Sequence, residues 1–387
     1  MVKLGNVCTV VSGTTPKSNH LEYWDGNINW VTPAELKDDS DIIFESQRKI
    51  TEKAVADTSM KSFPAGTVLL SSRAPIGKVA IAGVEMYCNQ GFKNLICSEA
   101  IYNRYLYHYL KSKTDYLNSL GRGATFKEIS KNIVESIEIP LPPINEQRKI
   151  AAVLDKVSDL IAKRRQQLDK LDELVKSRFV EMFGDPVSNS MGLPTESMTE
   201  VCAIIDGDRG KNYPKQDEFS DTGHCLFLNA KNVTTTGFSF ENCMFITREK
   251  DNALHNGKLE RGDVVLTTRG TLGNLAFYDD SVPFENVRIN SGMVILRMKK
   301  SVVTEVFFIE QFKLQLQSIK DKIASGSAQP QLPISTMSKI KILLAPLELQ
   351  EHFAAFVAQV DTSKLTIQKS LEKLEMLKKA LMQKYFE

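Results

Sequence analysis

Two stretches of the chain are close to being copies of each other. Residues 65–81 are AGTVLLSSRAPIGKVAI and residues 261–277 are RGDVVLTTRGTLGNLAF, and six of the seventeen paired positions are identical. The identical pairs include Arg73 and Arg269, each of which follows two hydroxyl residues. The spacing of about 200 residues is far longer than the period of 20–50 residues that solenoid repeats show. The repeat therefore indicates a duplicated domain.

Three further pairs of segments match in the same order along the two halves. They are GNVCTVVSG (5–13) with TEVCAIIDG (199–207), NQGF (89–92) with NSGM (290–293), and IEIPLPPINEQ (137–147) with KILLAPLELQ (341–350). In the last pair Gln147 and Gln350 are in register, whereas Leu349 stands where the first half has Glu146. The duplication thus extends through most of each half.

Each half changes character at a proline-rich stop. Before it, short β-branched runs such as 68–71 and 264–268 lie between turn residues and predict strands. After it, residues 145–183 and 348–386 contain neither Gly nor Pro, and hydrophobic residues recur at the alternating spacing of coiled-coil helices. The predicted seam residues are Leu154, Val157, Ile161, Arg164, Leu168, Leu171, Val175, Arg178 and Met182, and then Val357, Val360, Lys364, Ile367, Leu371, Leu374, Lys378, Leu381 and Tyr385.

The sequence therefore predicts an α+β protein with a pseudo-twofold internal repeat. Two similar mixed α/β modules are separated by two long helices that pair as an antiparallel coiled coil. Each seam contains two cations, which a parallel homodimer would bring close together, so we expect the two helices of one chain to pair. Two unrelated surface helices are the alternative, which their matching lengths and positions disfavour. The predicted boundaries are 1–144 for the first module, 145–184 for the first helix, 185–346 for the second module and 347–387 for the second helix.

The composition excludes several classes of protein. The chain is 42% hydrophobic and 25% charged, with a formal net charge of +2, which is typical of a globular protein. No apolar run approaches the roughly 18 residues that a membrane span needs, and the N-terminus has no signal-peptide pattern, so we expect a cytoplasmic protein. The six cysteines form neither a CxxC pair nor a zinc pattern with histidines, which predicts buried free thiols. Phosphate-loop, nucleophile-elbow, metalloprotease, dinucleotide and amino-methyltransferase motifs are absent, so we predict a non-catalytic protein without metal or cofactor.

Both modules combine cations, small hydroxyl residues and glycines near the ends of predicted strands. Arginine can form paired hydrogen bonds with guanine, and hydroxyl or backbone N–H groups can hold phosphates. Solvated turns explain any one of these segments equally well, and a repeated arginine can also bind a carboxylate inside its own module. The recurrence of Arg73 and Arg269 at matched positions makes solvated turns the less favoured interpretation. The candidate DNA-binding residues are Thr14, Thr15, Lys17, Ser71, Ser72, Arg73, Lys78, Arg122, Arg209, Lys211, Lys231, Thr267, Thr268, Arg269, Ser327 and Gln329.

Taken together, these segments resemble type I restriction–modification specificity subunits (S subunits). The resemblance rests on LSSRAPIGKVAI, NQGFK, IEIPLPPINEQRKIAAVLD and LVKSRFVEMFGDP in the first half, and on GDVVLTTRGTLG and INSGMVILR in the second. It implies that each module is a target recognition domain, which reads one half of a bipartite, asymmetric site in double-stranded DNA. It also implies that the helices set the spacing of the half-sites and dock two modification subunits, which carry adenine methylation. Restriction subunits join that complex for cleavage.

Two other functions stay open at this point. One is a coiled-coil scaffold whose repeated domains bind protein or glycan, and the other is a repeat enzyme with an unrecognised site. Salt-dependent binding to duplex DNA separates a DNA-reading subunit from a scaffold, because release of counterions from DNA gives a steep salt dependence. Turnover by the purified chain alone would favour the enzyme.

Overall fold

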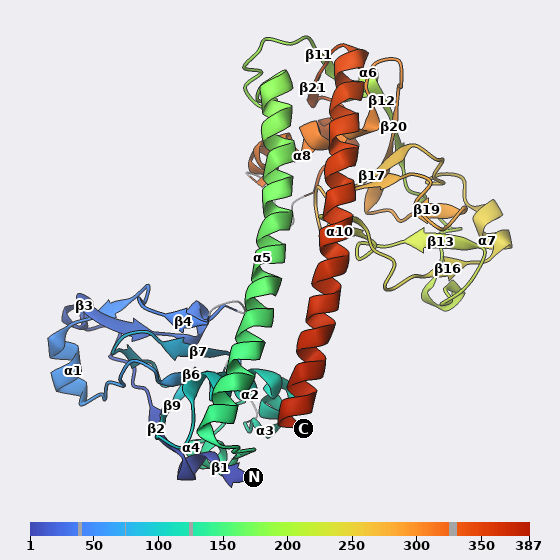
Figure 1. Ribbon diagram of the computed structural model, residues 1–387. Helices are drawn as coiled ribbons and strands as arrows, with labels where there is room; N and C mark the ends of the chain where they lie inside the picture. The colour runs from blue at the N-terminus through green and yellow to red at the C-terminus, as the bar shows by residue number, and fades with distance from the viewer. Residues whose placement is uncertain (38–40, 74, 124–126, 325–330) are drawn as a thin grey trace. The chain divides into compact units, whose positions relative to one another are not determined.

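The fold is described by a computed structural model over residues 1–37, 41–73, 75–123, 127–324 and 331–387. The chain forms two compact units, one of Met1–Gln167 with Ile367–Glu387 and one of Leu168–Thr366. Each unit contains one β-rich module and a segment of each long helix, α5 (Ile144–Phe183) and α10 (Leu347–Phe386) (Figure 1). The helices begin within one residue of the predicted stretches and end at the predicted residues. None of the helices in the described ranges is long and apolar enough to cross a membrane.

The ends of α5 are set by neighbouring residues. The carbonyl oxygen of Pro143 accepts hydrogen bonds from the N–H groups of Glu146 and Gln147, at 2.8 and 3.1 Å, and so closes the first turn. At the other end Gly184 takes a φ of 79°, which an L side chain rarely adopts, and its N–H bonds to the carbonyl of Val180. A left-handed glycine is a common way for a helix to stop.

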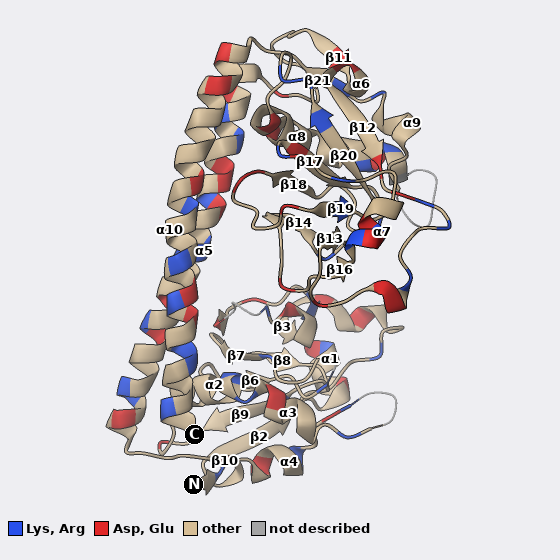
Figure 2. Cartoon of the chain, turned by 90° about the vertical axis from the view of Figure 1, so that its right-hand side faces the viewer, with Lys and Arg blue, Asp and Glu red and all other residues tan. Residues whose placement is uncertain are grey.

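The two long helices pair in antiparallel fashion in each unit. In the first unit, Phe386 near the end of α10 shares a core with Ile150 near the start of α5, and Arg165 Nη2 lies 2.7 Å from Glu375 Oε1. In the second unit, Lys364 forms an ion pair with Asp172 on the other helix. Each predicted seam residue is buried or partly buried, which confirms the heptad prediction. Figure 2 shows that the remaining surface of both helices carries charges of both signs.

The first module is built on two sheets. The larger has the strand order β2-β9-β6-β7-β4, and the smaller has the order β5-β3-β8. The helices α2 (Asn103–Ser112) and α3 (Thr114–Leu120) share a hydrophobic core with the larger sheet and with the start of α5. The other elements are β1 (Val2–Lys3), β2 (Cys8–Ser12), β3 (Trp24–Val31), β4 (Ile42–Ile43), β5 (Lys49–Ile50), α1 (Glu52–Thr58), β6 (Val68–Leu70), β7 (Val79–Ala82), β8 (Tyr87–Cys88), β9 (Lys93–Cys97), α4 (Lys131–Ser136) and β10 (Glu138–Ile139).

The second module repeats this topology. Its larger sheet has the order β12-β20-β17-β18 and its smaller sheet the order β16-β13-β19, which match the first module strand for strand except for β4. This correspondence confirms the predicted internal repeat and the α+β class. The elements are β11 (Thr195–Ser197), α6 (Met198–Val201), β12 (Cys202–Asp206), β13 (Cys225–Leu228), β14 (Val233–Thr234), β15 (Gly237–Phe238), β16 (Phe245–Ile246), α7 (Arg248–Ala253), β17 (Asp263–Thr267), β18 (Leu275–Tyr278), β19 (Val287–Ile289), β20 (Met293–Met298), α8 (Glu305–Ala324), α9 (Ile334–Met337) and β21 (Lys341–Leu343).

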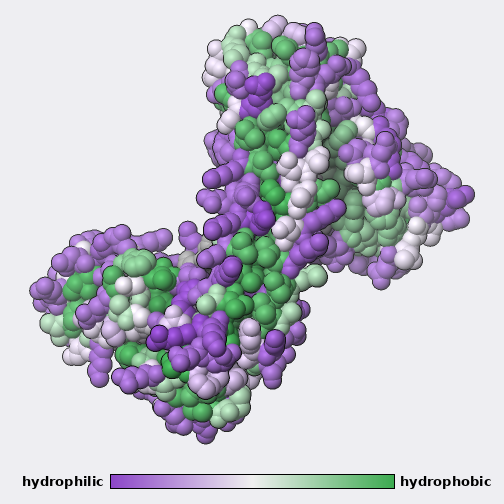
Figure 3. Space-filling view, viewed as in Figure 1, coloured by the Kyte–Doolittle hydropathy of each residue, from purple (hydrophilic) through white to green (hydrophobic). Residues whose placement is uncertain are grey.

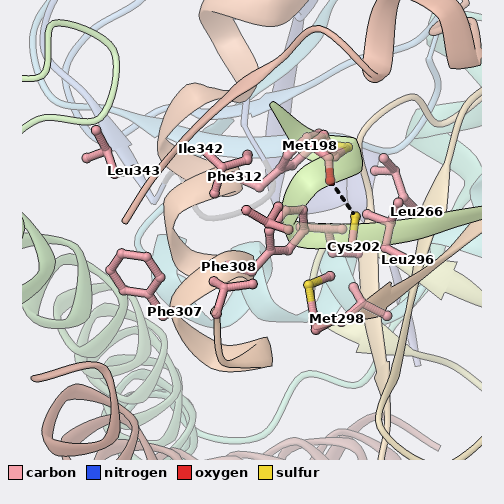
Figure 4. Close-up of a cluster of buried hydrophobic side chains, with 14 of the residues drawn as sticks. Met198, Cys202, Leu266, Leu296, Met298, Phe307, Phe308, Phe312, Ile342 and Leu343 are labelled. Atoms are coloured by element: carbon pink, nitrogen blue, oxygen red, sulfur yellow. Dashed lines mark hydrogen bonds between the residues drawn. The ribbon is translucent and has the colours of Figure 1, made fainter. Parts of the chain in front are cut away.

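The core of the second unit lies between its larger sheet and α8. Phe307, Phe308 and Phe312 on one helix pack with Leu266 and Leu296 from the strands (Figure 4). Phe307 also lies 5.3 Å from Phe179 between ring centroids, which continues this core onto α5. All six cysteines are free thiols, as predicted, and Cys97 and Cys243 are only partly buried.

Each long helix is attached to its own module by one buried glutamine, and the two glutamines occupy matching positions. The side-chain oxygen of Gln147 accepts from the N–H of Tyr102 at 2.9 Å, and its amide nitrogen donates to Ala100 and Pro142. Gln350 makes the same three kinds of bond, with the N–H of Thr304 and the carbonyls of Val302 and Ala345. Both side chains are fully buried. These glutamines therefore fix where each helix leaves its module.

Candidate nucleic-acid interface

Three loop segments of the first module meet at one end of the larger sheet. The N–H of Thr14 bonds to the carbonyl of Cys88 at 2.9 Å, and the N–H of Ser72 bonds to the carbonyl of Gly91 at 2.7 Å. Gly13 lies so close to Asn89 that a methyl group there would overlap the Asn89 carbonyl oxygen. The segments 13–15, 71–73 and 89–91 therefore form one continuous surface, which we call the first loop surface.

The second module builds the same arrangement. The N–H of Thr268 bonds to the carbonyl of Gly292 at 2.8 Å, and Gly207 packs against the carbonyl of Asn290 where a methyl group would not fit. Arg209 extends this contact, because its Nη2 lies 3.1 Å from Asp206 Oδ1 and 3.3 Å from the carbonyl of Ser291. The segments 206–209, 267–269 and 290–292 form the second loop surface.

The paired hydroxyl residues shape the turn beside each surface. Ser71 Oγ donates to the carbonyl of Pro75 at 2.7 Å and accepts from the N–H of Lys78 at 2.8 Å. Thr267 Oγ1 does the same with Thr271 and Asn274, at 2.5 and 3.0 Å. Ser72 is likewise fully buried, and Thr268 Oγ1 donates to the carbonyl of Gly292. The burial of these four hydroxyls gives no support to direct contact with DNA and indicates a role in shaping the turns.

The two matched arginines have different surroundings. Arg73 has a side chain 34% exposed, and its Nη1 lies 4.0 Å from Glu128 Oε2. Lys93, which is almost buried, reaches the other oxygen of Glu128 at 3.0 Å. Arg269 is exposed and forms no ion pair with any residue that the structure describes. Arg73 is therefore partly neutralised inside its module, whereas Arg269 presents its full charge.

The other candidate residues divide into four groups. Thr15 lies on the first loop surface, where its hydroxyl contacts Gln90. Arg122 lies beside this surface, because the backbones of Arg122 and Arg73 both pair with that of Glu128. Lys78 points away, since its Nζ donates to the carbonyl of Leu36 at 2.7 Å. Lys17, Lys211 and Lys231 are exposed on loops beyond the two surfaces. Ser327 and Gln329 lie outside the described residues.

Some residues of the loop surfaces were not among the predicted candidates. Gln90 is exposed at the tip of the turn before β9, and Ser291 holds the same place before β20. Each turn is held by an asparagine, because the side chains of Asn89 and Asn290 accept from an N–H two residues later at 2.9 Å. The repeated NQGF and NSGM segments were the available signal for these turns. In the described ranges, no group of three or more His, Cys, Asp or Glu residues is placed to hold a metal ion.

The loop surfaces lie in segments that match a known family. A sequence profile described as "Type I restriction modification DNA specificity domain" matches residues 1–173 and 195–376. The chain belongs to this family. The specificity subunit supplies DNA sequence recognition to a type I restriction–modification complex and is not its catalytic subunit. This result favours the DNA-reading function over the scaffold and the enzyme.

Similar proteins match either nearly the whole chain or part of it. The MjaIX specificity subunit of Methanocaldococcus jannaschii is 29% identical over 411 residues, which cover 99% of this chain and 91% of the relative. The EcoR124I/EcoR124II specificity subunit of Escherichia coli is 32% identical over 183 residues, or 46% of this chain and 45% of the relative. The type I S subunit of M. genitalium has a TM-score of 0.57 at 17% identity, and the match covers 100% of this chain and 95% of that chain. At that identity the likeness shows the fold.

Proposed function

We propose that each module reads one half of a bipartite, asymmetric DNA site through its loop surface. The observation that supports this proposal is the matched framework of the two surfaces, which carries different exposed side chains. The first surface presents Thr15, Gln90 and Arg73, and the second presents Arg209 and Arg269. Paired hydrogen bonds from arginine suit guanine and those from glutamine suit adenine, so the two surfaces suit different bases.

Domain boundaries follow from the same proposal. Residues 1–144 and 185–346 are proposed as the two target recognition domains, and 145–184 and 347–387 as the two helices. Gln147 and Gln350 support these limits, since each connects the first turns of a helix to the module before it. Because DNA recognition takes place where DNA is present, we propose the cytoplasm as the compartment.

The helices are proposed to set the distance between the half-sites. Each is 40 residues long and contributes to both units. Inserting one heptad into each helix, near Leu168 and near Leu371, keeps both seams in phase and lengthens the pair by about 10 Å. We expect the preferred spacer to lengthen by about three base pairs, or specific binding to be lost because the DNA grooves rotate. Unchanged affinity for the original spacer would refute this role of the helices.

Two modification subunits are proposed to dock on the helices. Exposed hydrophobic residues lie on both helices in each unit, among hydrophilic ones (Figure 3). Val153 and Leu160 on α5, both in the first unit, are one heptad apart and are 41% and 38% exposed. A pair of this kind is suited to a protein partner. Restriction subunits are proposed to join through the same complex.

One experiment tests the reading function directly. Methylation sites are sequenced in DNA from cells that contain this chain and its modification subunits. We expect two different half-sites separated by a fixed, unread spacer. Replacing residues 1–144 by the first module of a relative should change one half-site and leave the other intact. A change in both half-sites would show that the modules do not read independently.

A further inference from the structure

A cluster of buried and half-buried polar side chains connects the first module to α5. On α2, Arg104 Nε lies 3.1 Å from each carboxylate oxygen of Asp155, and His108 Nε2 lies 2.6 Å from Asp155 Oδ1. Arg104 Nη2 also lies 3.1 Å from Asp41 Oδ2, and the Tyr107 hydroxyl donates to the same carboxylate. His108 is 1% exposed. One carboxylate of the helix is thus held by two donors of the module.

The protonation states of His108 and Asp155 determine which group donates in the hydrogen bond between them. Burial lowers the pKa of His108, and its Nδ1 is buried without a hydrogen-bond partner in the described part of the chain. The neutral ring therefore donates through Nε2 to Asp155. Although burial opposes ionisation of Asp155, hydrogen bonds from His108 and Arg104 lower the pKa of this carboxyl. Lys378 on α10 faces the same cluster, and burial lowers the pKa of its ammonium group.

The second unit has apolar residues at most of the positions that match this cluster. Matching Gln147 with Gln350 and Tyr102 with Thr304 aligns α2 with α8 and the two long helices with each other. Val306 then replaces Arg104, Ala358 replaces Asp155 and Val175 replaces Lys378. Glu310 replaces His108 and pairs with Lys313 on its own helix. Phe179, Phe183, Phe307 and Phe353 connect the second module to the helices. The same alignment places Tyr105, Ile150 and Phe386 at matching positions in the first unit, where they share a core. The polar cluster of the first unit is therefore added to an apolar contact that both units have.

We propose that Asp155, Arg104 and His108 are positioning residues that fix the orientation of the first recognition domain on α5, and thereby the spacer length accepted next to its half-site. This inference rests on the proposed function. An apolar contact is non-directional, whereas a forked arginine–carboxylate pair and a buried histidine bond hold one geometry. Replacing even a buried ion pair by apolar residues often preserves stability, so the value of this half-buried cluster lies in the geometry that it selects.

The test uses the complete complex of this chain with its modification subunits. Duplexes with randomised half-sites and spacers of different lengths are selected by binding and sequenced. Two variants are compared with the wild type: Asp155→Asn, and R104V/H108L/D155A/K378V, which replaces four polar side chains at this contact by apolar ones. Glu375→Gln is the matched control, because it removes one negative charge from an exposed pair with Arg165 in the same unit. Fluorescence of Trp24 and Trp30 reports whether the first module is folded.

Both variants should select the wild-type bases in both half-sites. Their preference for the wild-type spacer over one a base pair longer or shorter should fall by about tenfold, the size of a single mismatch effect. Glu375→Gln should leave this preference unchanged. Folded variants with an unchanged spacer preference would overturn the proposal, and so would a change in the selected bases. Loss of the folded first module in both variants would assign the cluster to stability instead. Absence of sequence-selective binding by the wild-type complex would refute the proposed function itself.

Discussion

Replacing Gln147 or Gln350 by alanine should destabilise one unit and leave the other unchanged. Each side chain makes three hydrogen bonds to backbone groups, at 2.8–3.0 Å for Gln147 and 2.8–3.1 Å for Gln350. A hydrogen bond contributes about 0.5–1.5 kcal/mol, and alanine also leaves the three backbone groups without partners. We therefore expect a loss of about 3 kcal/mol. For a unit of this size that corresponds to a fall in melting temperature of about 6–12 °C.

The two tryptophans make the units distinguishable. Trp24 and Trp30 are both buried in the first unit, with ring centroids 5.2 Å apart. Their fluorescence therefore follows unfolding of the first unit, while far-ultraviolet circular dichroism follows both units. In denaturant titrations, Gln147→Ala should shift the fluorescence transition. Gln350→Ala should leave the fluorescence transition unchanged and shift the dichroism transition that belongs to the second unit.

Exposed glutamines on the same helices provide the controls. Gln166→Ala and Gln359→Ala should change the free energy of unfolding by less than about 0.5 kcal/mol. If Gln147→Ala behaves like Gln166→Ala, the three bonds do not hold the helix to its module. If Gln350→Ala moves the fluorescence transition as far as Gln147→Ala does, the division into two units is wrong.

Three further predictions concern the charges. Glu128→Gln should free Arg73 and Lys93, raise affinity for non-specific duplex DNA and steepen its salt dependence by about one unit of slope; an unchanged slope in a binding titration against salt would contradict this. Arg269→Ala should cost about 1–3 kcal/mol of specific affinity and relax one position of one half-site, as read from selected sequences; a folded variant with wild-type affinity would make that arginine structural. Because burial lowers the pKa of His108 below its ordinary 6.5, the unfolded chain binds more protons near and below that pH, so the first unit should lose stability as the pH falls through about 6.5. His108→Gln should weaken this dependence in the tryptophan fluorescence assay.

The long helices and the repeat could be predicted because their signals are local or duplicated. The seam of 154–182 depends only on spacing within one segment, and the structure buries those positions. Strands of two residues, such as β4 and β5, carry no such signal. Ile42 and Ile43 become a strand only through parallel pairing with Ile81 and Ala82, which are far away in the sequence.

The candidate site was harder to predict because side-chain direction depends on distant partners. Ser71 and Thr267 are hydroxyl residues near an arginine and a glycine in the sequence, as in many phosphate-binding loops. Each hydroxyl nevertheless points inward and donates to a carbonyl of the turn that follows. Glu128, which partly neutralises Arg73, lies in a distant segment, and no sequence motif connects the two residues. The possibility that a repeated arginine binds a carboxylate inside its module thus applies to Arg73, while Arg269 is exposed.

The division of the chain into units also has a consequence for the order in which the protein can fold during synthesis. The second unit, Leu168–Thr366, is one continuous segment, so all of its residues have been made before Ile367 is added. The first unit needs α10 as far as Phe386, whose ring lies 5.3 Å from that of Tyr105 and 5.6 Å from that of Tyr109. Domains usually complete their folding on the ribosome in order from the N-terminus. Here the first module must wait until the whole second unit and the end of α10 have been translated, with its hydrophobic surface for Phe386 open in the meantime.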